Sequence, residues 1–479
     1  MLIKTMVLLP LLLALPGTST ASPFLGLPNG VRGWPDDDVD CPCADPALCE
    51  PITQPRAQED VYAFHTGGNA SWRGYDWSQI TTVCVFGAVD PLLLCKAHSV
   101  GARVTLGAGG PPTGRWNDTA AVAAWVREGV ARVEAAKADG LNLDVEISAD
   151  DPQQIAGLAP AVRQMVDAMH AAQPGSHVTF DAASQGKTGG DQAQCGDMYG
   201  RDYDYKALAE VLDFIVVMDY DSNDAPGAVP ATIRYEPQGG HQPTYRYGTR
   251  EAAQAACADA GWPRLCRKDE LEGFSHCAFG WTSDWNGYWM AAAAKGCGGA
   301  GYNPASGSHE GAAGAYCCGR AALPCPTCFF ANAALPVVQN GVDCYGALGV
   351  PPSKLVLAMP WYAYDYTCAA TDTAGGACHV TAAVQTSLIE AKAQLATAIA
   401  PGRVWQSNSS TPHFFYRGGG ASQALHRVDY DDSQSLKLKY QLAKAAGARG
   451  VGMWTASAIA PDAEMVRTFW ADLKTFSTR

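Results

Sequence analysis

The sequence predicts an α/β fold, a closed (β/α)8 barrel that carries a cysteine-rich insertion after its sixth strand. Short apolar, β-rich runs alternate with longer helix-like segments from Val61 onward, and the β-rich runs number eight. Short buried strands that alternate with helices are typical of a parallel sheet covered by helices, and eight such units close a barrel. A Gly- and Cys-rich interruption at 223–324 breaks this rhythm once. An open, doubly wound sheet is the alternative arrangement.

The elements follow each other in a regular order. The expected strands are residues 61–64, 81–86, 102–106, 141–147, 177–180, 214–218, 355–359 and 450–454. The expected helices are residues 91–99, 120–137, 153–172, 204–211, 382–400 and 462–473. The expected strands are rich in β-branched residues, and the expected helices are rich in Ala, Leu, Glu, Gln and Arg. Both compositions match the known preferences of strands and helices.

The length of 479 residues suits one TIM barrel of about 250 residues with additions. We expect the following division: residues 1–21 as a signal peptide, 22–56 as a Cys/Pro-rich lead-in, 57–222 and 325–479 as the barrel, and 223–324 as the insert. The insert contains six cysteines, and the spacing around Cys257, Cys277 and Cys297 resembles Link or C-type-lectin-like modules. A disulfide-stapled module in a loop that follows a barrel strand would lie at the active-site end.

The N-terminus has the features of a secretory signal. Lys4 precedes an apolar run from Met6 to Pro16, and Ser19-Thr-Ala21 is a small-residue cleavage site. The run is too short for the alternative, a membrane anchor. We therefore expect the mature chain in the secretory pathway, in the lysosome or outside the cell, with no membrane partner after cleavage.

Cysteine content and glycosylation motifs agree with an oxidising compartment. The chain has 17 cysteines, an odd number, so at least one thiol is free or bound to another molecule. The glycosylation acceptors are Asn69, Asn117 and Asn408. No His/Cys quartet with metal-ligand spacing stands out, and we expect no metal, no cofactor and a monomer. The formal net charge of −13 excludes nucleic acid as a favoured partner.

The stretch Asp139-Gly-Leu-Asn-Leu-Asp-Val-Glu146 is the strongest functional signal. Asn142, Asp144 and Glu146 alternate with aliphatic residues, so in a strand the three polar side chains share one face. Neighbouring carboxylates push their pKa values apart, which lets one stay protonated and act as an acid. This pattern favours a site that cleaves carbohydrates. A half-exposed strand with a solvated polar face is the plainer alternative.

Four motifs at strand ends, in order, resemble the signatures of family 18 glycoside hydrolases, the chitinase-type barrels. They are Asp139-x-x-Asn-x-Asp-x-Glu146, Met218-Asp-Tyr-Asp221, Met359-Pro-Trp-Tyr362 and Met453-Trp454. Further segments, including Tyr75-Asp-Trp-Ser78 and Val178-Thr-Phe-Asp181, are similar to the chitobiase branch of that family. The resemblance covers about residues 40–222 and 325–475, and the insert lies outside it.

The resemblance implies a role for each motif residue. Glu146 would be the general acid, Asp144 would bind the substrate's N-acetyl nitrogen, and Tyr220 would hold the N-acetyl oxygen. Asp139 and Asn142 would support Asp144 from behind. The residues implied in substrate binding are Met218, Asp221, Trp361, Tyr362 and Trp454.

The implied activity is a retaining, substrate-assisted hydrolysis of β-1,4-linked N-acetylglucosamine, exo-acting from the reducing end, on the chitobiose core of freed N-glycans and on chito-oligosaccharides. An endochitinase and a non-catalytic glycan-binding lectin are the alternatives. Because many family members have Asp where Asn142 stands, and Asn cannot take up a proton, we also expect an altered pH dependence.

Overall fold

The computed structural model describes residues 41–54, 59–66, 70–111, 115–146, 152–187, 194–195, 203–222, 330–418 and 423–477, and short elements between 232 and 318. The signal peptide, most of the lead-in before Cys41, Asn69 and most of the insert lie outside the described residues. Within the described part, no helix combines the length and the apolar composition that a membrane crossing requires.

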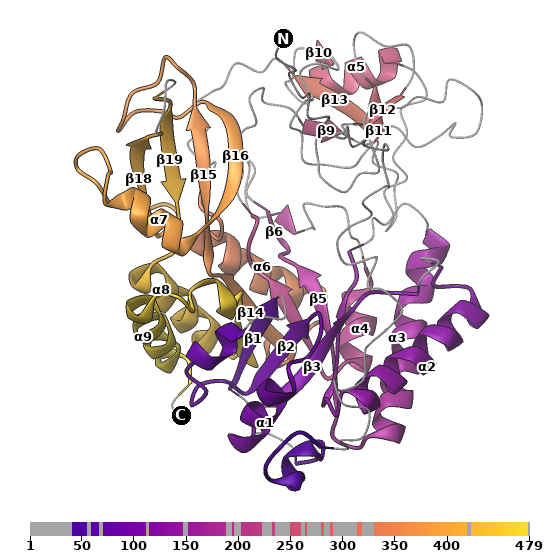
Figure 1. Ribbon diagram of the computed structural model, residues 1–479. Helices are drawn as coiled ribbons and strands as arrows, with labels where there is room; N and C mark the ends of the chain where they lie inside the picture. Colours follow the sequence, from indigo (N-terminus) through magenta and orange to yellow (C-terminus); the bar gives the residue numbers. More distant parts are fainter. Residues whose placement is uncertain are drawn as a thin grey trace, which may run out of the picture.

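Eight parallel strands form a closed barrel, which confirms the predicted fold class (Figure 1). They are β1 (Asp60–Thr66), β2 (Thr82–Phe86), β3 (Arg103–Ala108), β4 (Gly140–Asp144), β5 (His177–Ala183), β8 (Phe214–Met218), β14 (Leu355–Pro360) and β20 (Gly450–Trp454). The pairing of β1 with β20, with Tyr62 opposite Gly452, closes the ring and rules out the open sheet. All eight lie where the alternation of apolar runs predicts them.

Helices cover the outside of the barrel, and acidic side chains set where several of them begin. They are α1 (Pro91–Ser99), α2 (Thr119–Ala135), α3 (Pro152–Ala172), α4 (Tyr205–Val211), α6 (Leu335–Ala347), α8 (Ser433–Ala445) and α9 (Ala463–Asp472). Asp90, Asp118 and Asp204 each accept hydrogen bonds from first-turn backbone N–H groups, which would otherwise have no partner within the helix.

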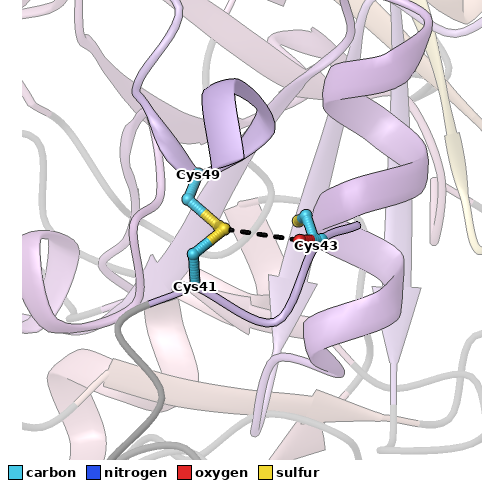
Figure 2. Close-up of side chains that lie close together, drawn as sticks. All are labelled: Cys41, Cys43 and Cys49. Atoms are coloured by element: carbon cyan, nitrogen blue, oxygen red, sulfur yellow. Dashed lines mark hydrogen bonds between the residues drawn. A yellow bond between two sulfur atoms is a disulfide. The ribbon is translucent and has the colours of Figure 1, made fainter. Parts of the chain in front are cut away.

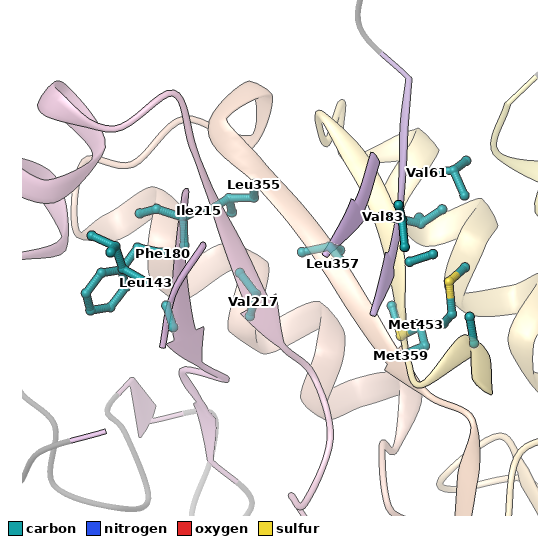
Figure 3. Close-up of a cluster of buried hydrophobic side chains, with 14 of the residues drawn as sticks. Val61, Val83, Leu143, Phe180, Ile215, Val217, Leu355, Leu357, Met359 and Met453 are labelled. Atoms are coloured by element: carbon teal, nitrogen blue, oxygen red, sulfur yellow. The ribbon is translucent and has the colours of Figure 1, made fainter. Parts of the chain in front are cut away.

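Alternation along the strands divides the core into two parts. Tyr62 and Phe64 point into the barrel, where they join Cys84, Phe86, Phe214, Val216, Val356 and Ala358. The intervening residues face outward and pack under the helices, and Figure 3 shows several of them, including Val61, Leu143, Phe180 and Met453. Asn142 and Asp144 therefore lie on the inner face of β4, between the outward Leu141 and Leu143.

Gly140 begins the strand that carries the acids, and no other residue fits there. Its φ is 145°, and a Cβ atom would lie 1.8 Å from the backbone oxygen of His177 on the neighbouring strand. The close approach of β4 and β5 at this point fixes the register that places Asp144 opposite Asp181.

An antiparallel sheet between β14 and α8 is an addition that the sequence analysis does not foresee (Figure 1). It consists of β15 (Tyr362–Cys368), β16 (Val380–Ser387), β17 (Val404–Gln406), β18 (Thr411–Arg417) and β19 (Leu425–Asp429), with α7 (Leu388–Leu395). The predicted helix over 382–400 is thus wrong at its start. Pairing of β16 with β15 along its whole length overrides the helix preference of its alanines, and the helix begins only after Ser387, which caps it together with Glu390.

Between β8 and α6, five described strands form a sheet of their own, and one helix packs against them (Figure 1). They are β9 (Thr232–Arg234), α5 (Arg250–Asp259), β10 (Arg264–Leu265), β11 (Phe279–Trp281), β12 (Tyr288–Met290) and β13 (Gly314–Cys318). Cys257, on α5, is disulfide-bonded. These elements occupy the position in the chain that the sequence assigns to an insertion.

One disulfide closes a loop within the lead-in, and a second fastens the lead-in to the barrel. Cys41 pairs with Cys49, as Figure 2 shows, and Cys43 pairs with Cys95 on α1. A third disulfide, Cys368–Cys378, joins the last residue of β15 to the segment that precedes β16. Cys84, inside the barrel, is the free thiol among the described cysteines, in agreement with the odd count.

Candidate active site

The polar residues of the predicted site converge at the carboxyl ends of the barrel strands. Asp144 is the last residue of β4 and is half-buried, and Glu146 follows two residues later and is exposed. Tyr220 comes just after β8, and both acids raise the pKa of its phenol, in addition to the larger effect of burial. The carboxyl ends of parallel barrel strands are where active sites of this architecture lie.

Asn142 lies below Asp144 inside the barrel, and it bonds to the next strand. Its Nδ2 atom donates to Thr179 Oγ1 and to Asp181 Oδ1, both at 2.9 Å. Thr179 also lies 3.3 Å from the phenol oxygen of Tyr62, which extends the contact across the barrel to β1. Asn142 is thus bonded to β5 on the inner face of the barrel.

Asp181 is a site residue that the motif assignment misses. It is 3% exposed on the inner face of β5, opposite Asp144. Burial raises the pKa of its carboxyl well above the ordinary value, and the negative charges of Asp144 and Glu146 raise it further. The signal in the sequence is the single acid that directly follows the predicted strand over 177–180, within the segment Val178-Thr-Phe-Asp181.

Aromatic rings form the floor beside the acids. The Trp454 ring is half-buried at the end of β20, with its centroid 5.1 Å from Phe64 and 5.6 Å from Phe86. Tyr220 stacks on Trp454 with centroids 6.2 Å apart, and Met218 is half-buried at the end of β8. An aromatic face of this kind fits the apolar face of a pyranose ring.

Asp221 is held by the added antiparallel sheet. Its Oδ1 atom accepts hydrogen bonds from the phenols of Tyr362 and Tyr364, the latter at 2.7 Å, and from Gln385 Nε2 at 3.2 Å. Burial raises the pKa of the Asp221 carboxyl, while these hydrogen bonds oppose the rise. Asp221 has a φ of 53°, a backbone conformation that Asp tolerates better than most residues.

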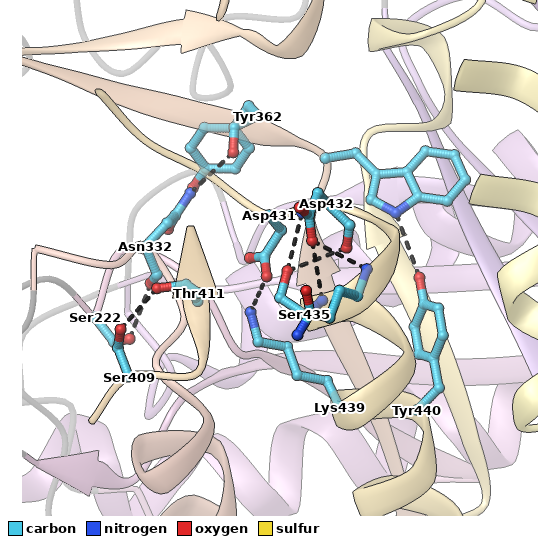
Figure 4. A network of polar contacts seen from close by, with 12 residues as sticks. Ser222, Asn332, Tyr362, Ser409, Thr411, Asp431, Asp432, Ser435, Lys439 and Tyr440 are labelled. Carbon is cyan, nitrogen blue, oxygen red and sulfur yellow. Dashed lines mark hydrogen bonds and ion pairs between the residues drawn. The ribbon is translucent and has the colours of Figure 1, made fainter. Parts of the chain in front are cut away.

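The turn that contains Asp221 is pinned by Asn332, which sequence reasoning does not identify. Asn332 Oδ1 accepts from the Asp221 backbone N–H at 2.7 Å, and its backbone oxygen accepts from the N–H and the hydroxyl of Ser222. Figure 4 shows this contact beside Tyr362, whose backbone oxygen accepts from Asn332 Nδ2 at 3.5 Å. Asn332, Tyr364 and Gln385 lie outside the barrel strands, so strand motifs could not reveal them.

Asp139 does not support Asp144, contrary to the sequence prediction. It precedes β4 at the opposite end of the barrel, about 16 Å from Asp144 at 3.3 Å per residue. Its carboxylate accepts from the backbone N–H groups of Ile52 and Val104, both at 2.7 Å, and lies 2.8 Å from His98 Nε2. Asp139 thus fastens the lead-in to the base of the barrel.

Trp361 is not a substrate-binding residue, which corrects a second prediction. It is 0% exposed and packs edge-on against Phe469 and Trp470, and its indole N–H donates to Tyr440 at 3.4 Å. The next residue, Tyr362, points to the opposite side, toward Asp221. Trp361, between β14 and β15, is thus a packing residue, and Tyr362, the first residue of β15, is a site residue.

Asp219 is a buried acid directly behind the site. It is 1% exposed, and burial raises the pKa of its carboxyl to about 7, an effect that Ser184 and the charge of Lys439 oppose. Lys439 itself forms a fully buried ion pair with Asp431, drawn in Figure 4. Asp219 directly precedes Tyr220 in the chain, so a buried carboxyl that titrates near neutral pH lies next to a site residue.

Two groups of cysteine and acid side chains lie close enough together to resemble metal sites in the described part. They are Cys41, Cys43 and Cys49, and Cys368, Asp372 and Cys378. All of these cysteines are in disulfides, and disulfide sulfurs are not the thiolate ligands that metals need.

Two of the predicted glycosylation acceptors, Asn117 and Asn408, are exposed.

Comparison with known proteins agrees with this geometry. A model of the family described as glycosyl hydrolases family 18 matches residues 329–458. Di-N-acetylchitobiase from Rattus norvegicus is 28% identical over 432 residues, which are 88% of this chain and 87% of that protein. The protein of the same name from Bos taurus is 40% identical over 146 residues, 30% of this chain and 78% of the bovine sequence.

Solved structures share the fold at lower identity. The chitinase from Chromobacterium violaceum has a TM-score of 0.53 and 15% identity, and covers 88% of this chain and 100% of its own. A chitinase from Cycas revoluta in complex with (GlcNAc)3 has a TM-score of 0.52 at 15% identity, with the same coverage of both chains. At these identities the likeness bears on the fold alone, and it agrees with the eight-stranded barrel.

Proposed function

Because this chain belongs to glycosyl hydrolase family 18 and is a glycosidase, we propose that it hydrolyses β-1,4 linkages between N-acetylglucosamine residues. The observation that carries the proposal is the pair Asp144 and Glu146 at the carboxyl end of β4, beside Tyr220 and the Trp454 ring. The names of the relatives, di-N-acetylchitobiase, support this substrate class.

The proposed mechanism uses the substrate's own N-acetyl group in place of a protein nucleophile. Glu146 gives its proton to the glycosidic oxygen, and the bond from that oxygen to the anomeric carbon breaks. The N-acetyl carbonyl oxygen bonds to the same carbon from the opposite face, which forms an oxazolinium ion. A water molecule then opens the ion and returns a proton to Glu146, so the anomeric configuration is retained.

Neighbouring side chains orient the reacting group. Asp144 accepts a hydrogen bond from the N-acetyl N–H and balances the positive charge of the oxazolinium ion. Tyr220 donates a hydrogen bond from its phenol to the N-acetyl oxygen, and the raised pKa of the phenol keeps it protonated. Trp454 forms the floor under the sugar that is attacked. A thiazoline analogue of the oxazolinium ion should inhibit strongly, and absence of inhibition would contradict substrate assistance.

We also propose exo action from the reducing end, with the chitobiose core of freed N-glycans among the substrates. Chitotetraose labelled at its reducing end tests this directly by mass spectrometry. Early release of labelled N-acetylglucosamine alone supports exo action. Early release of a disaccharide would point to an endochitinase, and binding without any product would point to a lectin.

We propose that the chain acts in the secretory pathway, in the lysosome or outside the cell, as a monomer. The disulfides of the lead-in and of the added sheet support an oxidising compartment, and the exposed Asn117 and Asn408 are accessible to glycosylation. Expression in animal cells, followed by enzymatic deglycosylation, should give secreted or lysosomal protein whose mass falls. A protein that stays in the cytosol and whose mass is unchanged by the deglycosylating enzyme would contradict the assignment.

A further inference from the structure

Asn142 and Asp181 form a pair inside the barrel in which only Asp181 can carry a proton. The two N–H groups of the Asn142 amide are directed to Thr179 Oγ1 and to Asp181 Oδ1, both at 2.9 Å. Asp181 Oδ1 is therefore an acceptor, and a proton on this carboxyl belongs on Oδ2. The register of β4 and β5 places Asp181 directly beside Asp144, on the same inner face of the sheet.

Two carboxyls on adjacent strands, in a buried place, do not both ionise readily. Asp181 is 3% exposed, while Asp144 is half-buried and opens toward the substrate side of the barrel. The proton therefore belongs on the deeper carboxyl and the negative charge on the outer one. Burial and the charges of Asp144 and Glu146 keep the pKa of Asp181 well above its ordinary value, in agreement with this division.

Building on the proposed function, we propose that Asp144 and Asp181 titrate as one pair that shares a proton, and that Asp181 holds the proton which the amide at position 142 cannot hold. Asp181 is a positioning residue, since it acts on the substrate only through Asp144. A hydrogen bond from a protonated Asp181 to an ionised Asp144 would fix the orientation of Asp144 and keep it ionised at lower pH than a lone carboxylate.

The other titratable groups around Asp181 come from three more elements. Tyr62 on β1 and Cys84 on β2 both have pKa values raised well above the ordinary ones, chiefly by burial, so they stay neutral. Tyr220, after β8, also stays protonated for the same reason. Glu146 contributes charge from the open end of the barrel. The charge near Asp181 at neutral pH is thus set by the carboxyls.

Asp181→Asn in the full-length protein separates this role from simple packing. The new amide still accepts from Asn142 through its oxygen, so a structural role would be preserved. Its Nδ2 then takes the place of Oδ2 and donates to Asp144, so the acid limb of the kcat/KM profile should stay near its wild-type position. The amide cannot lose a proton, so the fall in kcat/KM at high pH that follows ionisation of the shared proton should move to higher pH by about one unit or more. The midpoint of thermal unfolding should change little. A folded variant with the wild-type profile would overturn the proposal.

The exchange variant Asn142→Asp/Asp181→Asn supplies the matched control. It restores one carboxyl and one amide across the same contact, with the carboxyl now on β4 beside Asp144. We expect the alkaline limb to return toward its wild-type position. An exchange variant that folds but keeps the shifted limb would also overturn the proposal, because the shift would then not arise from a shared proton.

A measurement that needs no substrate keeps this inference distinct from the proposed function. Infrared spectra of the wild type would be recorded at pH 8. This pH is above the pKa of Asp219, which is about 7, so most Asp219 carboxyls are ionised. The pair predicts a protonated-carboxyl band there that Asp181→Asn removes; its absence from the wild type would overturn the pair. If the wild type hydrolysed no N-acetylglucosamine oligosaccharide, the proposed function would fail. The infrared band would still show whether Asp144 and Asp181 share a proton.

Discussion

The phenol oxygen of Tyr364 lies 2.7 Å from Asp221 Oδ1, which joins the added antiparallel sheet to the turn after β8. Tyr362 from the same strand and Gln385 from β16 bind the same oxygen. One wall of the site is thus built by the added sheet and not by the barrel strands, and the orientation of Asp221 depends on the docking of that sheet.

Tyr364→Phe should weaken substrate binding more than it slows turnover. Loss of one hydrogen bond to a buried carboxylate loosens Asp221, with an expected rise in KM of about tenfold and a stability loss of about 1 kcal/mol. Steady-state kinetics and thermal unfolding measure both effects.

Tyr366→Phe is the matched control on the same strand. Its phenol donates to the backbone oxygen of Phe330 at 2.8 Å, and its ring stacks on that of Tyr364. We expect a similar stability loss with an unchanged KM. An equal rise in KM in both variants would mean that Asp221 does not transmit the effect.

Asp139→Asn should destabilise the protein and leave turnover unchanged under folding conditions. The amide cannot serve the backbone N–H groups of Ile52 and Val104 and the imidazole of His98 together, so we expect a loss of about 2 kcal/mol or more. Chemical denaturation and kcat are the measurements. A folded Asp139→Asn protein with strongly reduced kcat would restore the sequence prediction that Asp139 supports Asp144.

Asp219→Asn should stabilise the protein at neutral and alkaline pH and have little effect near pH 4. The pKa of Asp219 is raised from 3.8 in the ordinary state to about 7 in the folded chain, so the folded state binds more protons between these values. Its burial therefore costs stability progressively as pH rises from about 4 to 7, by about 4 kcal/mol in total.

Unfolding midpoints of Asp219→Asn and wild type, compared across that pH window, test this sign. The difference should grow with rising pH and level off above pH 7. A difference that is constant, or that shrinks as pH rises, would contradict the buried-acid assignment.

The sequence predicts the barrel well because alternation in strands and end signals in helices are local. The strand over 214–218 and the helix over 91–99 have the predicted bounds, since an apolar run ends at Met218 and Asp90 with Pro91 starts the helix. The run from Ala382 fails as a helix because its partner, β15, lies about 20 residues away and its pairing is not visible locally.

In the candidate site, too, the sequence predicts the residues that local motifs contain and misses those that depend on contacts between distant segments. Asp144, Glu146, Tyr220 and Trp454 lie at strand ends, where motif and topology coincide. Trp361 and Tyr362 are neighbours in one motif, and only the packing of Trp361 against α9 and the contact of Tyr362 with Asp221 show which of them faces the site. Asp181 and Asn332 act through contacts between strands and loops, which no single segment of sequence contains.

The most direct test of the central claim compares wild type and Glu146→Gln on a chito-oligosaccharide, with turnover measured by mass spectrometry and binding by calorimetry. Gln keeps the shape of Glu146 but cannot give a proton to the glycosidic oxygen. We expect kcat to fall by about 10³-fold while the dissociation constant changes little. A Glu146→Gln protein with near-normal turnover would contradict the assignment of Glu146 as the acid and, with it, this account of the site.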